Sequence, residues 1–374
     1  MFPFTRREAK ASASVPLIAL SQLGAAHWTQ RDPVALAREG FERNAVGYRC
    51  IRMIAEAAAS VALVSPDADG PVADLIARPN PEQSGPELLE AFYGHLQTAG
   101  NAFLYGVTLE DGAVREIHVL RPDRMRVLKG RSGWPMGWVM GEGRDERRFL
   151  READGWSPVM QMKLFHPTDD VMGFSPLAAA SRAVDVHNAG AAWAKALIDN
   201  SARPSGALVY GAKDGARMTE EQFAGLKREL EEAHSGVANA GKPMVLEGGL
   251  DWKPMGLTPA DMDFIAARHA AAREIALAFG VPPMMLGIPG DNTYSNYKEA
   301  NLAFWRLSVL PLVEKAARAI SAWLSQRADA PVMLRPDLDR VPALSAERDA
   351  LWARLEGASF ATVEEKRALA GLES

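Results

Sequence analysis

The stretch GFSPLAAASRAVDVHNAGAAWAKALIDNSARPSG, residues 173–206, decides the fold. Ser175 is a good helix N-cap, and Pro176 suits the first helical position. Alanine, the residue with the highest helix propensity, recurs throughout, and no proline follows until Pro204. The sequence therefore predicts a slim helix over 175–203, about 40 Å long at ~1.5 Å per residue.

A second long helix is predicted over 258–280. Thr258 can cap it, Pro259 suits its first position, and Gly280 ends it. Between the two helices, residues 204–257 read as a compact insert of strand (207–210), short helix (219–234), strand (243–247), turn and strand (250–255). Two extended helices that carry a small α/β module resemble a stalk with a head, a shape suited to assemblies that stack stalks side by side.

The chain before residue 173 reads as one α+β domain over roughly 35–170. Apolar residues at helical spacing predict helices over 44–60 and 86–98. Asp111-Gly112, a favoured two-residue hairpin turn, separates two strand-like runs. The predicted strands cover 61–65, 103–109, 114–120, 125–128, 136–140 and 160–165.

The chain after the second long helix is predicted to be mainly helical. A third helix runs from about 295 to 326, and Pro311 inside it predicts a kink or break near Leu310. A strand-like VML tripeptide (332–334) and two short helices follow. The second of these begins with Thr362 and Glu365, a capping-box pair.

Composition limits the possible functions. The 374 residues carry a formal net charge of -5, with 48% hydrophobic and 24% charged residues, which is ordinary globular composition. Mild acidity disfavours a broad basic face for nucleic acid but is compatible with a protein that surrounds DNA and lets it slide. A single cysteine, Cys50, excludes an intramolecular disulfide and a cysteine-rich metal site.

No membrane or secretion signal is indicated. A membrane-spanning helix would need about 18 consecutive apolar residues, and the sequence has no such run. Near the N-terminus, Arg6, Arg7 and Lys10 precede an apolar patch that is short and contains Pro16, which makes a poor signal peptide. Residues 1–30 are therefore expected to form a flexible arm.

Motifs of catalysis and cofactor binding are incomplete. The segment GVANAGK at 236–242 has phosphate-loop spacing, but Pro243 replaces the magnesium-binding Ser or Thr. Ser295 to Lys298 matches S-x-x-K, yet its K-T-G partner element is missing. The seven histidines are scattered, so no metal pair is visible. We predict no catalytic residue, no metal site and no cofactor.

Five segments resemble, in family order, the portal proteins of tailed bacteriophages, in the family typical of long non-contractile-tailed phages and prophages. They are GFSPL at 173–177, ARPSG at 202–206, VLEGGLDWKPMGLTPADMDF at 245–264, FGVPPMMLG at 279–287 and TYSNYKEAN at 293–301. Alanine and arginine richness suggests a GC-rich genome, as for the portal of an alphaproteobacterial gene transfer agent. The sequence leaves phage, prophage and gene transfer agent open.

The resemblance implies an α+β portal-type protomer, assembled as a ring that is usually dodecameric. Its parts would be a flexible arm (1–30), an α+β wing (31–174), a two-helix stem (175–203 and 258–280), a small α/β clip (204–257), a tunnel loop (281–299), a kinked wing helix (300–330) and a helical crown (331–374).

The resemblance also implies site residues. The tunnel loop would line the DNA channel with Asn292, Thr293, Tyr294, Ser295, Asn296, Tyr297 and Lys298. Lys298 could contact a DNA phosphate or pair with an acid of a neighbouring subunit. The clip would face the terminase and later the adaptor with Arg203, Ser205, Lys213, Arg217, Lys242 and Glu247.

The implied function is a ring at one capsid vertex that conducts DNA during packaging and ejection, without enzymatic activity. Implied partners are further copies of the chain, double-stranded DNA without sequence specificity, the major capsid protein, the terminase large subunit and the head–tail adaptor, and no membrane. The protein would reside in a virion or phage-like particle and assemble in the bacterial cytoplasm. Two alternatives remain: a nucleotide-binding enzyme that uses the Gly236–Lys242 loop, and a ring adaptor other than a portal.

Overall fold

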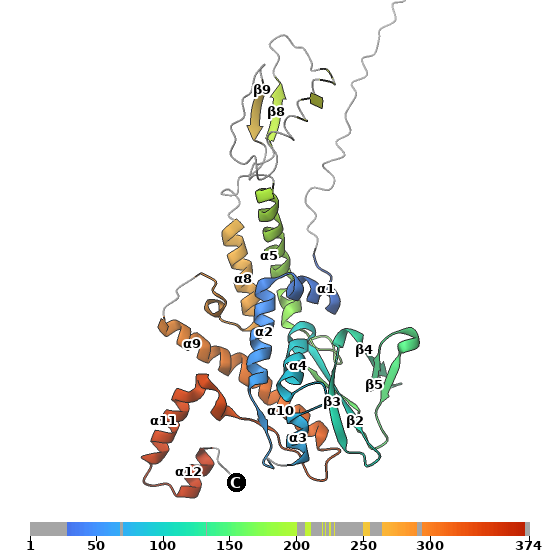
Figure 1. Ribbon diagram of the computed structural model, residues 1–374, viewed down its shortest axis with the longest axis vertical. Helices are drawn as coiled ribbons and strands as arrows, with labels where there is room; N and C mark the ends of the chain where they lie inside the picture. The colour runs from blue at the N-terminus through green and yellow to red at the C-terminus, as the bar shows by residue number, and fades with distance from the viewer. Residues whose placement is uncertain are drawn as a thin grey trace, which may run out of the picture.

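Two helices, α5 (Pro176–Asp199) and α8 (Phe264–Phe279), run side by side along the long axis of the molecule and lead away from a broader body of helices and sheets (Figure 1). The computed structural model describes residues 28–67, 70–131, 133–199, 206–210, 250–254, 264–289 and 294–370, together with Thr219, Glu221, Ala224, Gly225 and Arg228. The two long helices predicted from sequence are confirmed over these ranges.

Two helices of the body pack against each other, α2 (Ala45–Ser60) and α4 (Gly85–Ala99). The Asn44 side chain caps α2 by accepting a hydrogen bond from the Gly47 amide, and α4 begins with a capping box of Ser84 and Glu87. The predicted apolar face of α2 is buried at Cys50, Ile51, Ile54 and Ala58. Short helices α1 (Pro33–Ala37) and α3 (Pro71–Ala77) flank this pair, with a π-helical turn after α1 (Arg38–Glu42).

The first sheet is antiparallel, in the order β3-β2-β7, with strands β2 (Asn101–Thr108), β3 (Val114–Leu120) and β7 (Val159–Lys163). Its central strand is buried on both faces. Ala102 and Leu104 belong to the main core beneath the helices, whereas Phe103 points into a second, smaller core. A strand buried on both faces reads as a continuous apolar run, which is why the sequence predicted it.

The loop between β2 and β3 differs from the sequence prediction. Thr108 pairs with Val114, so five residues connect the strands instead of the two of a tight hairpin turn. The turn starts at Leu109, whose carbonyl accepts from the Gly112 amide, and Gly112 has a φ of 76°. Asp111 accepts a hydrogen bond from the Ala113 amide, which stabilises the longer loop.

The second sheet, in the order β4-β5-β6, covers the other face of β2 and contains β4 (Met125–Lys129), β5 (Pro135–Met140) and β6 (Arg147–Leu150). The second core lies between the sheets, where the rings of Phe103 and Trp138 meet edge-on with centroids 4.8 Å apart. Sequence patterning missed β6, because three of its four side chains are exposed and two are arginines.

The predicted third helix is two α-helices, α9 (Tyr294–Phe304) and α10 (Leu310–Leu324), joined by a π-helical turn (Trp305–Val309). The predicted irregularity near Leu310 is therefore confirmed. Pro311 lies in the first turn of α10, where it has no N–H to donate to the π-helical turn that precedes it. The buried face of α10 joins the main core.

The C-terminal segment contains β10 (Arg335–Pro336), which pairs antiparallel with β1 (Leu63–Val64), and helices α11 (Ser345–Glu356) and α12 (Val363–Leu369). The two short helices and the Thr362–Glu365 capping box are confirmed. The VML tripeptide was wrongly predicted as a strand: it precedes β10 as irregular chain, with Val332 and Leu334 buried.

Beyond the ends of α5 and α8 lie β8 (Gly206–Tyr210) and β9 (Leu250–Pro254), which confirm the strands predicted at 207–210 and 250–255 (Figure 1). The two strands pair antiparallel. The predicted strand at 243–247 lies outside the described residues. Among the helices that the structure describes, none has the length and apolar character needed to cross a membrane.

Candidate functional site

Helix α5 is fixed to the body by a close contact between two backbone turns. Gly100 ends α4 with a φ of 70°, and a Cβ there would lie 2.6–2.7 Å from backbone atoms of Gly173, Phe174 and Ser175. Across the same contact, the Gly173 amide donates to Oδ1 of Asn101 at 2.8 Å. The turn preceding α5 therefore rests directly on the first sheet.

A buried amide network joins α5 to the start of α2. Nδ2 of Asn44 donates to Oδ1 of Asn188 at 2.8 Å and lies 3.2 Å from Nδ1 of His187. Asn188 in turn donates to the carbonyl oxygen of Glu39 at 3.0 Å. Burial and the nearby Arg268 lower the pKa of His187, which favours a neutral imidazole in this network.

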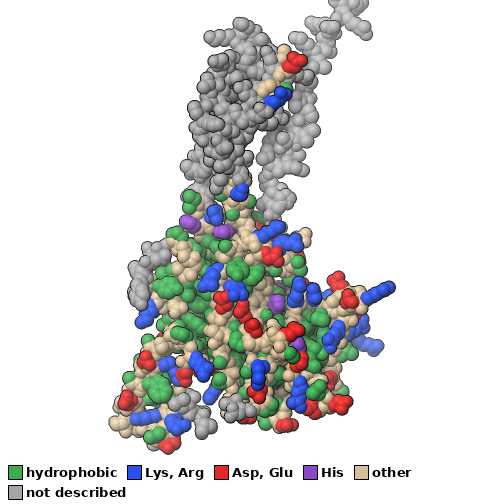
Figure 2. Space-filling view, in the orientation of Figure 1, with side chains coloured by type: hydrophobic (Ala, Val, Ile, Leu, Met, Phe, Trp, Pro, Cys, Tyr) green, Lys and Arg blue, Asp and Glu red, His purple; other side chains and the backbone are tan. Residues whose placement is uncertain are grey.

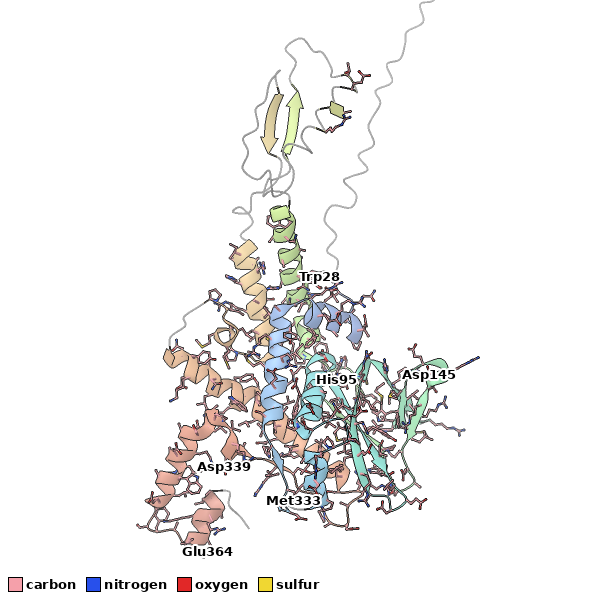
Figure 3. The ribbon with its side chains drawn as sticks, in the orientation of Figure 1. Trp28, His95, Asp145, Met333, Asp339 and Glu364 are labelled. Atoms are coloured by element: carbon pink, nitrogen blue, oxygen red, sulfur yellow. The ribbon has the colours of Figure 1, made fainter. Side chains whose placement is uncertain are left out.

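The start of the described chain lies against the same helix. The Thr29 amide and hydroxyl both donate to the Asp185 carboxylate, the amide at 2.9 Å. The Arg182 guanidinium lies 5.7 Å from the ring centroid of Trp28 (Figure 3). These contacts fix residues 28 and 29 on α5.

The α5–α8 pair is close because one position has no side chain. A Cβ on Gly190 of α5 would come within 2.9 Å of Cγ and 3.3 Å of Cδ of Arg268 on α8. Away from this contact, α8 leaves Ile265 and Leu277 exposed, and the π-helical turn that precedes α10 leaves Leu307 exposed. Large exposed apolar side chains on adjacent elements are typical of a protein–protein contact.

The end of α8 is connected to the π-helical turn. Gly280 ends the helix with a φ of 68°, and its carbonyl accepts a hydrogen bond from the Ser308 hydroxyl at 2.7 Å. A 3-10 turn follows (Pro283–Leu286), and Arg273 of α8 donates to the carbonyl oxygen of Pro289. The chain after α8 is thereby tied to both α8 and the third helical segment.

The structure covers only part of the predicted site. Tyr294 and Ser295 begin α9, and Asn296, Tyr297 and Lys298 lie exposed on its first turns. The segment expected as a loop over 281–299 thus holds a 3-10 turn and the start of a helix. The remaining predicted residues lie outside the described ones: Asn292, Thr293, Arg203, Ser205, Lys213, Arg217, Lys242 and Glu247.

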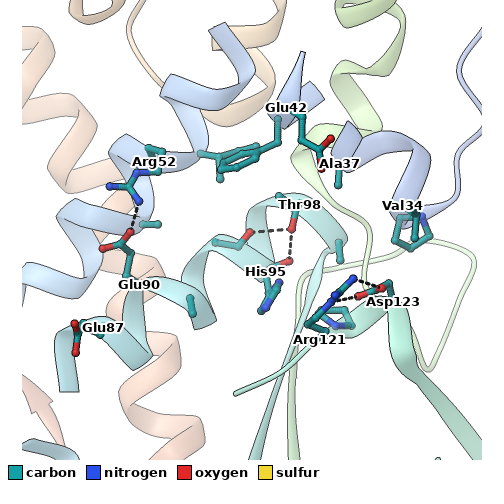
Figure 4. A pocket seen from close by; sticks show the side chains of 18 residues that line it. Val34, Ala37, Glu42, Arg52, Glu87, Glu90, His95, Thr98, Arg121 and Asp123 are labelled. Atoms are coloured by element: carbon teal, nitrogen blue, oxygen red, sulfur yellow. Dashed lines mark hydrogen bonds and ion pairs between the residues drawn. The ribbon is translucent and has the colours of Figure 1, made fainter. Parts of the chain in front are cut away.

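The body also contains a groove of about 510 Å³ between α1, α2 and α4 (Figure 4). Four of its six charged side chains form ion pairs, Arg52 with Glu90 at 2.6 Å and Arg121 with Asp123 at 2.7 Å. His95 also lines it, and burial lowers the pKa of that imidazole. These paired charges stabilise the walls of the groove and do not form an acid–base pair of the kind that catalysis requires.

The incomplete catalytic and cofactor-binding motifs of the sequence gain no support from the described structure. Within the described part of the chain, no cluster of three or more His, Cys, Asp or Glu side chains could hold a metal ion. Ser295 and Lys298 of the S-x-x-K match lie in the first turns of α9. The Gly236–Lys242 loop lies outside the described residues.

Sequence reasoning missed several residues that position these helices. Gly100 and Asn101 contact the turn before α5 and fix its position. The local pattern around Gly100, a glycine after a helical run, indicates only that α4 ends there. The contact between Gly190 and Arg268 joins residues 78 positions apart, and no local pattern predicts it.

Residues 45–371 match the family described as phage portal protein. Two solved structures of the neck of a gene transfer agent particle are 52% identical to this chain and cover 94% of it. The empty neck, computed with C6 symmetry, superimposes with a TM-score of 0.73 over 96% of its chain, and the native neck, computed with C12 symmetry, with 0.72 over 97%. The portal protein of Enterobacteria phage HK97 is 25% identical over 265 residues, 69% of this chain and 59% of its own.

Proposed function

Since the chain belongs to the phage portal protein family, we propose that it forms the ring through which DNA enters and leaves a phage-like particle. It is the portal of such a particle, and the observation that carries this conclusion is the 52% identity to a chain of the gene transfer agent neck over 94% of the sequence. The family match gives no support to a nucleotide-binding enzyme or to a ring adaptor outside this family.

The proposed oligomer is a dodecamer within the particle. The C12 symmetry of the matching neck supports twelve copies, and the exposed Ile265, Leu277 and Leu307 provide apolar surface for contacts between copies. Helix α5 carries small side chains at the exposed positions Ala179, Ala189 and Ala192. The small side chains favour close packing of neighbouring copies around the ring axis.

In this ring, α5 and α8 form the stem, and the segment from 281 to 299 lines the channel. The exposed Asn296, Tyr297 and Lys298 at the start of α9 offer polar contacts to DNA phosphates without a base-reading pattern. The net charge of -5 per chain keeps binding weak, because few counterions are released. Weak, sequence-independent contact is what a sliding duplex requires.

The proposal extends to partners. The clip, 204–257, would contact the terminase large subunit during packaging and the head–tail adaptor afterwards, and the wing would contact the major capsid protein at one vertex. The energy of packaging would come from the terminase, so the portal itself would not be an enzyme. Assembly would take place in the bacterial cytoplasm before the particle is completed.

Native mass spectrometry of the purified full-length chain at about 0.2 M salt tests the ring, since surface ion pairs are partly screened there. We expect a closed species near twelve subunits. A chain that stays monomeric both alone and in purified particles would contradict the proposal.

A charge-removal experiment tests the role of Lys298. In a packaging assay, Lys298→Gln is expected to lower the yield of DNA-filled particles while the ring still forms, because it removes the cation proposed to face DNA. Arg318→Gln, which removes an exposed cation from α10, is the matched control. If Lys298→Gln abolished the ring itself, Lys298 would serve an ion pair between subunits instead of DNA.

A further inference from the structure

The C-terminal hairpin, defined as α11, α12 and the turn between them, is folded without being covered. Neither helix contains a buried residue. Four large apolar side chains point to solvent: Phe360 is 92% exposed, Val363 67%, Leu369 65% and Trp352 51%. Figure 2 shows apolar and charged side chains mixed at the lower left, where Figure 1 places these helices.

The body holds the hairpin mainly at one end. Arg306 of the π-helical turn pairs with Glu347 at 2.5 Å, and Arg348 pairs with Asp339. Val341 and Leu344, just before α11, are buried in the main core. Asp339 lies where the hairpin joins the body, and Glu364 lies at its far end (Figure 3).

Helices of 12 and 7 residues are marginal in water without an apolar face to bury. The Thr362–Glu365 capping box and the ion pairs at the base stabilise the ends of the hairpin but leave its apolar side chains in water. A hairpin of this kind requires a partner that covers those four side chains.

The charges around the apolar side chains indicate the kind of partner. Six charged residues of the hairpin form no ion pair with any described residue, three acidic and three basic: Asp349, Glu356, Glu364, Arg354, Lys366 and Arg367. A balanced set does not favour DNA or an anionic membrane, both of which select a basic face. An apolar centre with a rim of both signs is typical of a protein interface.

We propose that this hairpin packs against the same region of the adjacent copy, through Trp352, Phe360, Val363 and Leu369. The inference rests on the proposed ring. A rotation axis along α5 and α8 keeps each element at one height, so the hairpin, at the end of the long axis opposite β8 and β9, meets only that end of its neighbours (Figure 1). Each copy both offers and receives the contact, so the mixed charges can pair around the ring.

The test compares Phe360→Asp and Leu369→Asp with Leu109→Asp. Leu109, in the β2–β3 loop, is 61% exposed, which matches the 65% of Leu369, and lies outside the hairpin. Mass photometry of a dilution series measures the concentration at which rings dissociate. We expect the two hairpin variants to raise it at least about tenfold, and the control to change it less than about twofold. Because all three side chains are exposed, each monomer should keep the wild-type far-ultraviolet circular dichroism.

Hydrogen exchange provides a second readout. Amides of α11 and α12 should exchange rapidly in the monomer and become protected in the purified wild-type ring. A wild-type ring with unprotected hairpin amides, and unchanged dissociation of Phe360→Asp, would overturn this inference and leave the portal function intact. Protection that appears only in complete particles would overturn it too, because another particle protein would then cover the hairpin. Failure of the wild-type chain to form a ring either alone or in purified particles would instead overturn the proposed function.

Discussion

Gly173 has no space for a side chain. A Cβ there would overlap the carbonyl oxygen of Gly100 and lie 2.8 Å from the backbone nitrogen and oxygen of Leu164. All three are backbone atoms of residues next to the ends of β2 and β7, so they cannot move aside as a flexible side chain would. This position therefore determines how close α5 begins to the sheet.

Gly173→Ala is accordingly expected to lower the free energy of unfolding by about 3 kcal/mol, the upper part of the usual overpacking range. Urea denaturation followed by tryptophan fluorescence measures the change. Gly94→Ala is the matched control, because no atom lies within 4 Å of its added Cβ on α4. That substitution should stabilise the helix by up to about 1 kcal/mol. Equal stability of the two variants would show that the backbone around Gly173 can relax.

Two histidines make the stability of the body depend on pH. Burial lowers the pKa of His95 and of His187 below the ordinary 6.5, with a smaller contribution from Arg268 at His187. The unfolded chain therefore binds protons more readily than the native state as the pH falls toward 6.5 and below, and the free energy of unfolding decreases. The carboxyl groups with lowered pKa, such as Asp111 and Asp169, destabilise the protein only nearer their ordinary 3.8.

We expect urea midpoints to fall between pH 7.5 and pH 5.5, and His95→Gln to reduce that fall because glutamine does not titrate. His269→Gln is the control, since His269 is exposed on α8. A His95→Gln variant that loses as much stability as wild type over this range would assign the pH dependence to other groups.

At the scale of elements, two helix caps differ in the elements to which they hydrogen-bond. Asn44 caps α2, but the same side chain also reaches α5 through Asn188 and His187. Thr362 caps α12 in an exposed position, and its side-chain hydrogen bond to a described residue stays within that helix. A buried cap that joins two helices leaves several polar groups unsatisfied when it is removed.

Asn44→Ala should therefore lower the free energy of unfolding by about 2–3 kcal/mol, against about 1 kcal/mol or less for Thr362→Ala. Thermal unfolding by calorimetry compares the two. The explanation would be wrong if both alanine variants lowered the midpoint by the same amount.

Elements with a strong local signal could be predicted from the sequence. Capping residues and apolar spacing placed α2, α4, α5 and α12 within a few residues of their observed bounds. The short β6 and α3 were missed because they owe their structure to tertiary packing, α3 through the buried Leu75. The site residues that the portal motifs indicated stay a prediction. The contact of Gly100 with the turn before α5 is long-range, and a single sequence does not encode it locally.

At the scale of the whole molecule, the single cysteine lies at the centre of the main core. Cys50 has no exposed surface, and burial raises the pKa of its thiol to about 12. Alkylation requires an exposed thiolate, so it can proceed only when the body opens. Cys50 is thus a built-in probe of global unfolding.

Iodoacetamide should alkylate Cys50 in the native protein at pH 8 at least about a thousandfold more slowly than in denaturant, following the equilibrium constant of opening. Mass spectrometry after timed quenching gives the rate. Ala153→Cys, in an exposed turn outside the C-terminal hairpin, provides a second thiol that should react at the denatured rate in the same sample. Equal rates at both cysteines would show that the core opens locally around α2.

The antiparallel pairing of α5 and α8 has a consequence for evolution and engineering. Both helices join the body at one end and stand side by side, so the chain leaves and re-enters the described structure at neighbouring points. Everything between the two helices can be exchanged as a cassette without altering the connectivity of the body. A lineage can therefore replace this segment by recombination within one gene, and a designer can graft a foreign module at the same two positions.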